Sequence, residues 1–270
     1  MTQFTALVMA ANRQGPHNVV AAAYNVSHKC LVEADGVPMV LRVVRSLQQA
    51  EHVGRIVISI DDRTILDQVP EVSALIADGT VELAPSGPDL FSSVFAAANA
   101  LGDDGFPLVI CTADSALQTP QMVDYFCAQM VAGGIDVAVG MTPEQVVSED
   151  WPEALDQAAF HRFRNGGFST ANLYGILRRD ALEVATVMRT GGQFRIRPMR
   201  VLKAFGLRAL ILYRYRLATL DGLFQRLSRR FGMKVKAIPL PFADAAVDVD
   251  GPHNLVLVEK RLAERRRKAA

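Results

Sequence analysis

Two loops of this chain carry residue types suited to binding charged ligands, and each follows directly after an apolar run. The first, Ala10-Ala11-Asn12-Arg13, ends the run 4–9 and precedes Gly15-Pro16. Small side chains let backbone N–H groups approach an anion such as a phosphate closely. Asp114 follows the run 106–111, where a short carboxylate can bind a hard cation such as Mg²⁺. These residues predict a site for a phosphate and a divalent cation.

Asp114 also has a structural explanation that the sequence leaves open. A helix is predicted from Pro120, and an Asp shortly before a helix can cap it, here through Ser115 or Thr119. The carboxylate would then satisfy backbone amides rather than bind a metal ion.

Alternating strands and helices are predicted to position these loops. Apolar runs predict strands at 5–9, 55–60, 80–84, 106–111, 136–139, 169–177 and 233–238. Helical spacing of apolar residues predicts helices at 39–50, 64–77, 92–101, 120–131, 180–190 and 250–266. This alternation predicts an α/β fold with a mainly parallel sheet covered on both faces. Ligands bind such sheets outside the carboxyl ends of the strands, so the loops after residues 9, 84 and 111 matter most.

Composition and charge restrict the classes of function. A chain of 270 residues that is 50% hydrophobic can bury a sizeable core. Its net charge of +1 gives no global field for nucleic acid, so an anion site must be local. Cys30, Cys111 and Cys127 lack the spacing of zinc sites or disulfide frameworks, and we expect reduced thiols. No segment is long and apolar enough for a membrane span or a signal peptide, so we expect a cytoplasmic protein.

Three motifs occur in a set order along the chain. They are Ala6-Leu7-Val8-Met9-Ala10-Ala11 with the later Lys29 and Gly36-Val37-Pro38-Met39, then Val109-Ile110-Cys111-Thr112-Ala113-Asp114, then Asp248-Val249-Asp250-Gly251-Pro252-His253-Asn254-Leu255. Together they resemble the nucleotidyltransferases of the MobA-like superfamily, which includes the sugar-1-phosphate nucleotidyltransferases. The resemblance covers residues 4–141 and 166–258, except for 191–230.

This resemblance implies a Rossmann-like fold of the GT-A type, with a three-layer, mainly parallel sheet. It implies one nucleotidyltransferase domain over residues 1–270 with a helical insertion at about 191–230. A nucleoside triphosphate (NTP) would bind under the first loop, with Mg²⁺ as cofactor and pyrophosphate as product. Lys29 would contact the phosphates, and Arg13 is a second candidate for that role.

The resemblance also assigns the metal ligands. Asp114 takes the position of the family's metal-binding aspartate. Magnesium usually takes one or two protein carboxylates, so we expect one partner. We choose Asp250, because Asp250-Gly251-Pro252 resembles the Asp-Thr-Pro that opens the family's last helix, and Asp248 is the alternative. His28 and His253 are close in sequence to these residues and receive no role.

The base and the acceptor have expected positions too. Ser86, Gly87 and Ser92 fall where relatives hold the base, although a plain turn and helix cap explains them nearly as well. Gly166, Gly167 and Asn172 resemble the acceptor region of the family, although Gly-Gly is also a common loop. The chain departs from the family in the first loop, where Asn12-Arg13-Gln14 replaces glycine and small residues.

Residues 191–230 interleave large apolar residues with arginines, which predicts two amphipathic helices, the second beginning near Thr219. A lobe packed on the sheet domain or on a second subunit explains this pattern. The other hypothesis is a lid or dock for an acidic or lipid-linked acceptor, since basic amphipathic helices bind anionic membrane surfaces.

The function implied is therefore an Mg²⁺-dependent transfer of a nucleoside monophosphate unit from an NTP to a phosphorylated small molecule, such as a sugar or alcohol phosphate. One alternative is a nucleotide-sugar-dependent glycosyltransferase of related topology, but the expected Asp-x-Asp is absent at Thr112-Ala113-Asp114. Another is a nucleotide-binding protein without turnover, which the altered first loop favours.

Overall fold

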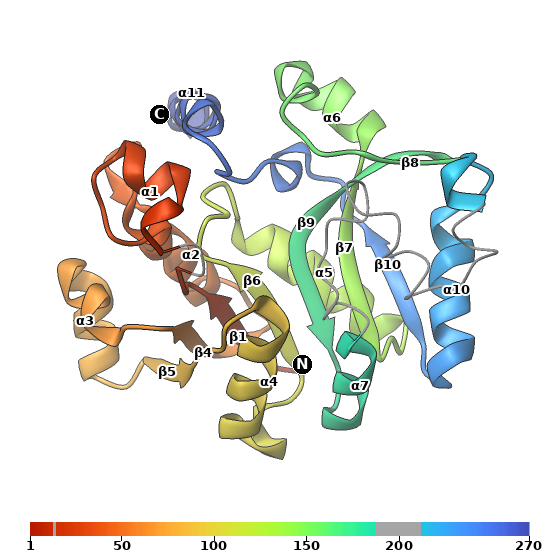
Figure 1. Cartoon of the computed structure of the whole chain (residues 1–270), viewed down its shortest axis with the longest axis horizontal. Coiled ribbons are helices and arrows are strands. Elements are labelled where there is room, and N and C mark those ends of the chain that lie inside the picture. Colours follow the sequence, from red (N-terminus) through yellow and green to blue (C-terminus); the bar gives the residue numbers. More distant parts are fainter. Residues whose placement is uncertain (13–14, 187–211, 270) are drawn as a thin grey trace.

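The computed structural model of the chain describes residues 1–12, 15–186 and 212–269 (Figure 1). Arg13 and Gln14 lie outside the described residues. The same holds for 191–211, which are about half of the predicted insertion and include its first predicted helix.

The elements follow one another as helix and strand in turn. The strands are β1 (Phe4–Met9), β2 (Glu33–Ala34), β3 (Val37–Pro38), β4 (Val53–Ile60), β5 (Val81–Pro85), β6 (Leu108–Thr112), β7 (Val137–Pro143), β8 (His161–Phe163), β9 (Gly166–Ile176) and β10 (Val235–Pro239). The α-helices are α1 (Val19–Ala23), α2 (Met39–Gln48), α3 (Pro70–Ala77), α4 (Leu90–Leu101), α5 (Pro120–Ala132), α6 (Glu144–Asp150), α7 (Leu182–Ala185), α10 (Leu220–Phe231) and α11 (Pro252–Ala269). The 3₁₀ helices are η1 (Gly15–His17), η2 (Lys29–Leu31), η3 (Arg63–Gln68), η4 (Asp103–Gly105), η5 (Pro152–Ala154), η6 (Arg179–Ala181) and η8 (Ala243–Ala246).

The central sheet is mainly parallel, with the strand order β10-β7-β9-β6-β1-β4-β5. Strand β9 alone on this path runs antiparallel to its neighbours β6 and β7, and β8 pairs with its first residues. The register aligns Met9 with Ser59 of β4 and with Thr112 of β6. The residues that follow β1, β4 and β6 therefore emerge side by side at one edge of the sheet.

Helices cover both faces of the sheet, which confirms the predicted three-layer α/β architecture (Figure 1). The side chains of β1 divide between two cores, with Ala6 and Val8 on one face and Leu7 and Met9 on the other. Helices α2, α3 and α5 pack on the first face, whereas α4, α7 and α10 pack on the second. The strands are apolar on both sides because each side is buried, as the continuous apolar runs predicted.

Several predicted elements differ in detail from those observed. The helix predicted at 64–77 is two elements, η3 and α3, because Pro70 begins a new helix rather than continuing the first. Helix α10 begins as predicted, and the Thr219 side chain accepts a hydrogen bond from the Gly222 amide. Asp248 and Asp250 follow η8 in irregular backbone, without strand structure.

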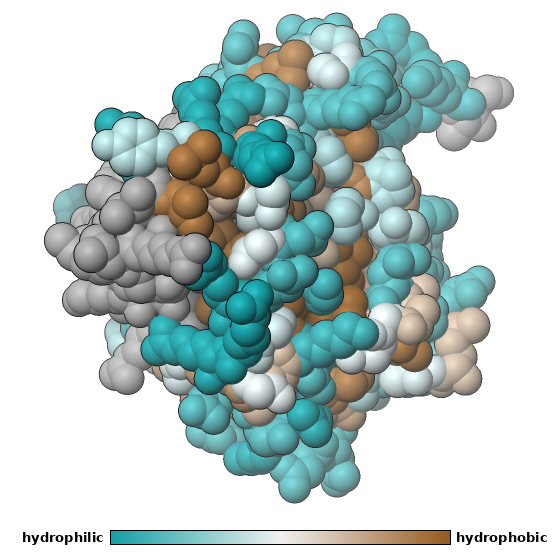
Figure 2. Space-filling model, turned by 90° about the vertical axis from the view of Figure 1, so that its right-hand side faces the viewer, coloured by the Kyte–Doolittle hydropathy of each residue, from teal (hydrophilic) through white to brown (hydrophobic). Residues whose placement is uncertain are grey.

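The face formed by α6, β8 and α10 is largely hydrophilic in its described part, with groups of hydrophobic side chains between the hydrophilic ones (Figure 2). Tyr215 and Leu217, just before α10, are among the exposed large hydrophobic residues. Within the described ranges, we find no helix with the length and apolar character required to cross a membrane.

Candidate active site

The centre of the candidate site is an ammonium group held by two carboxylates. Lys29 Nζ donates to Asp114 Oδ2 at 2.5 Å and to Asp250 Oδ1 at 2.9 Å. The three residues come from η2, from the loop after β6 and from the segment before α11. The structure thus brings together three of the predicted site residues from positions as much as 221 residues apart.

The charges in this cluster stabilise one another. Burial alone would lower the pKa of Lys29, but the charges of Asp114 and Asp250 outweigh it and raise that pKa. Burial alone would raise the pKa of Asp114, but the Lys29 ammonium holds it below its ordinary value. Lys29 and Asp114 are therefore held in their ionised forms, which suits a site for a cation and phosphates.

Asp114 is placed by β6 and by a backbone hydrogen bond from the preceding residue to β1. Ala113, the residue before it, donates its amide to Met9 O at 3.0 Å, which fixes the loop beside the end of β1. The N-cap of α5 is Thr119, whose hydroxyl accepts from the Met122 amide at 3.4 Å. The alternative in which Asp114 caps α5 is therefore wrong, and its carboxylate remains directed to Lys29.

A third carboxylate, Asp248, lies next to this cluster. It accepts hydrogen bonds from Asn172 Nδ2 at 2.6 Å and from Ser115 Oγ at 3.2 Å. Burial and the charges of Asp114 and Asp250 raise its pKa well above the ordinary value. Asp248 thus bridges Ser115, the neighbour of Asp114 in the chain, and Asn172, the residue predicted to contact the acceptor.

Asn172 reaches Asp248 because β9 is irregular there. The register between β7 and β9 shifts between Val139 and Met141, which pair with Tyr174 and Thr170. Asn172 lies in this bulge with φ 47°, in the left-handed region that Asn tolerates better than most residues. Such bulges change the direction of a side chain, and left-handed residues cluster at functional sites.

The described residues fit a magnesium ion. Asp114 Oδ1 is buried and has no hydrogen-bond partner among them, so one carboxylate oxygen is available for a ligand. The described ranges contain no group of three His, Cys, Asp or Glu residues arranged to hold a metal. Magnesium needs no such group, since it is bound by one or two carboxylates and completes its shell with water and substrate phosphates. Asp114 and Asp250 would hold it after Lys29 moves from them.

The loop after β1 is less open to phosphate than the sequence predicted. The Ala10 amide donates to Ser59 O at 2.9 Å, and the Asn12 amide donates to Asp61 Oδ1 at 3.1 Å. Two amides of this proposed phosphate loop are therefore engaged with β4 and the residue after it. Ala11 lies between them, half-buried.

The residues predicted to hold the base lie at the start of α4. Ser92 and Asp89 form a capping box, in which each side chain accepts from the backbone amide of the other. The Gly87 amide donates to the buried Ser93 Oγ at 2.9 Å, and a side chain on Gly87 would collide with Ser92 Oγ at 2.6 Å. The Ser92 hydroxyl thus works as a cap, and Ser86 and the backbone nearby remain the candidates for base contacts.

Gly166 and Gly167 lie apart from the carboxylate cluster. They are the first two residues of β9, paired with Phe163 and Arg162 of β8, and lie roughly 15–20 Å along the strand from Asn172. A side chain on Gly167 would collide with the carboxylate of Glu144, which pairs with Arg162. The structure therefore places only Asn172 of the three predicted acceptor residues next to the cluster.

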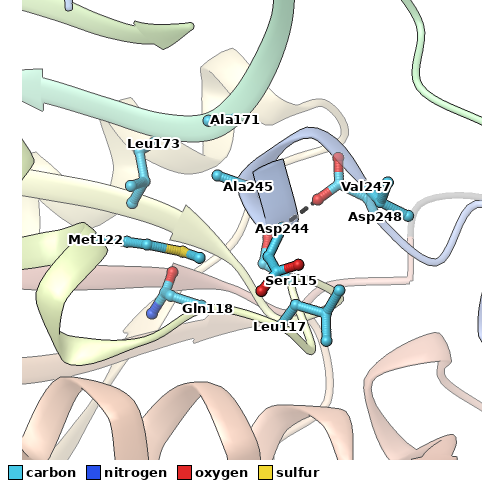
Figure 3. Close-up of a pocket in the computed structure, with 10 residues that line it drawn as sticks. All are labelled: Ser115, Leu117, Gln118, Met122, Ala171, Leu173, Asp244, Ala245, Val247 and Asp248. Atoms are coloured by element: carbon cyan, nitrogen blue, oxygen red, sulfur yellow. Dashed lines mark hydrogen bonds between the residues drawn. The ribbon is translucent and has the colours of Figure 1, made fainter. Parts of the chain in front are cut away.

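A small cavity lies behind Asp248 (Figure 3). Its volume is about 10 Å³, which is room for roughly one water molecule. Figure 3 shows the hydrogen bond between Ser115 and Asp248 on one side of it and the apolar Met122 and Leu173 on the other. The cavity is too small for a substrate.

No role was predicted for His28 or Asp61, yet Asp61 binds the first loop and His28 binds Asp61. His28 Nε2 is 3.1 Å from Asp61 Oδ1, the oxygen that also accepts from the Asn12 amide. Asp61 directly follows the buried strand β4, as Asp114 follows β6. The rule that singled out Asp114 could therefore have found Asp61 as well.

The sequence of the chain matches one protein family. The profile of the MobA-like NTP transferase domain matches residues 20–158, just over half of the chain. The matched region begins after β1 and the altered loop, and it includes Lys29 and Asp114. No curated protein matches the chain in sequence.

Solved structures of similar fold include a hypothetical transferase from Thermus thermophilus. It is 20% identical, with a TM-score of 0.72 over 94% of this chain and 100% of the other. A CMP:2-keto-3-deoxy-manno-octonic acid synthetase in complex with CTP has a TM-score of 0.55 at 14% identity, over 98% and 100% of the two chains. A 4-diphosphocytidyl-2C-methyl-D-erythritol synthase from Anaerococcus prevotii has a TM-score of 0.57 at 9% identity, over 97% and 96%. At these identities the likeness shows a shared fold.

Proposed function

Because the chain belongs to the MobA-like NTP transferase domain family, we propose that it transfers a nucleoside monophosphate unit from an NTP to a phosphorylated small molecule. Magnesium is the proposed cofactor, and pyrophosphate is the second product. The observation that carries this proposal is the meeting of Lys29 with Asp114 and Asp250 at the carboxyl edge of the sheet. An ammonium and two carboxylates at one point suit a triphosphate bound together with a divalent cation.

In the proposed reaction, a phosphate oxygen of the acceptor attacks the α-phosphorus of the NTP. The bond between the α-phosphorus and its bridging oxygen breaks, and pyrophosphate leaves with the electron pair. The attacking phosphate oxygen is already ionised, so the protein need not remove a proton. Catalysis then depends on positioning and on charge stabilisation.

Each residue of the cluster has a part in this proposal. Lys29 turns from the carboxylates to the phosphates and neutralises charge there as a point cation. Asp114 and Asp250 hold Mg²⁺, which when bound supplies charge neutralisation at phosphate oxygens. Asn172, held by Asp248, orients the acceptor on the β9 side of the site.

The loop at Ser86 and Gly87 is the proposed base site. It follows β5 and lies next to the end of β4, whose Ser59 hydroxyl donates to Pro85 O at 3.1 Å. CTP is the nucleotide to test first, because two structures of similar fold carry cytidine nucleotides in their names. A sugar or alcohol phosphate is the proposed acceptor class.

A second candidate function is nucleotide binding without turnover. The observation that favours it is the engagement of the Ala10 and Asn12 amides with Ser59 and Asp61. A loop whose amides are already satisfied offers fewer donors to a triphosphate. Binding and turnover must therefore be measured separately.

The test is pyrophosphate release with each of the four NTPs, Mg²⁺ and a panel of sugar and alcohol phosphates. We expect release with one NTP that depends on both metal and acceptor. Asp114→Asn should lower it by roughly 100-fold or more, as loss of a charge-stabilising group does. Nucleotide binding by calorimetry without any release would support the second candidate instead. If the chain shows no nucleotide binding and no pyrophosphate release, both candidate functions are contradicted.

A further inference from the structure

Three segments of the proposed triphosphate site converge on one carboxylate oxygen. Asp61 Oδ1 accepts from the backbone amide of Asn12 at 3.1 Å and lies 3.1 Å from His28 Nε2. Asn12 belongs to the loop after β1, Asp61 directly follows β4, and His28 is the residue before η2. One oxygen atom thus connects the proposed phosphate loop with the segment that carries Lys29.

The carboxylate of Asp61 fixes the role of one histidine nitrogen. A carboxylate oxygen only accepts, so His28 Nε2 must carry the proton that it shares with Asp61. His28 Nδ1 lies 3.2 Å from Ser27 Oγ. The His28 side chain is only 10% exposed, so its orientation is set by these two contacts and by packing.

The side chain of Asn12 forms a second connection between the same two segments. Asn12 Nδ2 donates to Ser27 O at 2.6 Å and to Gly15 O at 3.0 Å. The Asn12 residue is therefore bound to the Lys29 segment directly, through Ser27, and indirectly, through Asp61 and His28. Asp61 stays ionised in this position, because the hydrogen bonds from Asn12 and His28 outweigh its partial burial and lower its pKa.

We propose that Asp61 is a positioning residue for nucleotidyl transfer, which through Asn12 and His28 holds the first loop and Lys29 at a fixed separation. The inference rests on the proposed function, since it concerns the same site. Lys29 must reach phosphates that the loop also contacts, and an error of about 1 Å in such an arrangement can cost roughly 100-fold in rate. A charged acceptor that binds both segments is a stronger constraint than a neutral one.

The chain offers a matched control for Asp61. Asp62 is the next residue, but its carboxylate is exposed and caps η3 through the Thr64 amide and hydroxyl. Asp62→Asn removes the same charge one residue away without touching the first loop. Its effect on nucleotide binding should be negligible.

The experiment measures the Kd of CTP and of inorganic tripolyphosphate in Mg²⁺ by calorimetry, with intact chains of the wild type, Asp61→Ala, Asp61→Asn and Asp62→Asn. We expect Asp61→Ala to weaken binding of both ligands by roughly 10–100-fold, as loss of such supporting groups does. Asp61→Asn should have a smaller effect, because its side-chain oxygen can still accept from one partner. Tripolyphosphate has no base, so equal losses for both ligands place the defect at the phosphates.

Variants of His28 distinguish a positioning role of Asp61 from a purely structural one. In His28→Gln the side-chain amide can still donate to Asp61, whereas the leucine of His28→Leu has no donor. His28→Gln should therefore keep most of the nucleotide affinity that His28→Leu loses. The double variant Asp61→Ala/His28→Leu should be no weaker than the single Asp61→Ala, because both changes remove one connection. Melting temperatures of all variants, measured alongside, report folding.

Three outcomes overturn the inference. If Asp61→Ala or, should that variant fail to fold, Asp61→Asn binds tripolyphosphate as the wild type does, Asp61 does not position the site. If affinity follows melting temperature in all variants, including Asp62→Asn, the role is structural only. If the wild type binds none of the four NTPs, the proposed function fails and this inference fails with it.

Discussion

Lys29 and the proposed magnesium ion compete for the same two carboxylates. The ammonium contacts one oxygen each of Asp114 and Asp250, so a cation cannot bind both fully while the lysine stays. A triphosphate resolves this competition, since it gives the lysine other oxygens to bind. We therefore expect metal and nucleotide to bind together, and metal alone to bind weakly.

Lys29→Met tests this competition. Without the ammonium, Asp114 and Asp250 are left as a pair of like charges, and Mn²⁺ binding in the absence of nucleotide should tighten by about 10-fold or more. Electron paramagnetic resonance titration with Mn²⁺ measures this directly. Lys234→Met is the control, because Lys234 Nζ bonds Gly133 O at the opposite edge of the sheet. Unchanged or weaker Mn²⁺ binding by Lys29→Met would show that the lysine does not occupy the metal position.

The variant Asp248→Asn tests the raised pKa of the third carboxyl group through the pH dependence of stability. A raised pKa means that the folded protein disfavours the ionised carboxyl, so wild-type stability falls as pH rises through that pKa. Asn has no such penalty, and it can accept from Asn172 and donate to Ser115. The melting temperature of Asp248→Asn should therefore exceed that of the wild type at pH 7, and the difference should vanish below pH ~4, the ordinary carboxyl range. A difference that does not change with pH would contradict the assignment.

At the level of elements, the regular part of the fold could be predicted from the sequence. The strands β1 and β6 are nearly continuous apolar runs, β4, β5 and β10 are mostly apolar, and helix α2 shows clear helical spacing. The short elements α1, β2, β3, α6 and β8 were missed, because a few residues do not establish a period. Asp114 could be predicted as a site residue because ligands bind beyond the carboxyl ends of parallel strands. The hydrogen bond from Asn172 to Asp248 could not be predicted, because it depends on a bulge whose register no local sequence pattern encodes.

The backbone conformation of the bulge in β9 leads to a separate prediction about stability. Asn172 has φ 47°, where a Cβ costs roughly 1–2 kcal/mol that glycine avoids. Asn172→Ala and Asn172→Gly both remove the amide that binds Asp248, but Ala should be less stable than Gly by about 1 kcal/mol in denaturant unfolding. Equal stabilities would mean that residue 172 leaves the left-handed region in the variants. Both should weaken acceptor-dependent turnover.

On the scale of the whole molecule, α11 is attached to the rest of the chain through Asp244. Its carboxylate accepts from Arg261 Nε at 2.6 Å and from Arg265 Nη2 at 2.5 Å. Arg261 also pairs with Asp150 and lies over the Trp151 ring at 5.0 Å. Asp244 belongs to η8, only four residues before Asp248, so this attachment also supports the carboxylate cluster.

Asp244→Asn should therefore lower the free energy of unfolding by about 3 kcal/mol, because it leaves two partly buried arginines without their shared anion. Asp150→Asn is the matched control. Asp150 binds the same Arg261 but its side chain is 60% exposed, so its loss should cost at most about 1 kcal/mol. Urea unfolding of both variants measures the difference. Losses of at most about 1 kcal/mol in both variants would mean that the attachment of α11 does not depend on Asp244.

Strand β9 also determines when the sheet of a newly synthesised chain can close. β6 and β7 are consecutive strands in the chain, but β9 lies between them in the sheet. Until residues 166–176 leave the ribosome, β6 and β7 each have an open edge of unpaired amides and carbonyls. Open edges can pair with other chains, so a product that ends before residue 166 should aggregate. The strand that joins β6 to β7, and carries Asn172 to the site, is thus also a protection of the chain against aggregation.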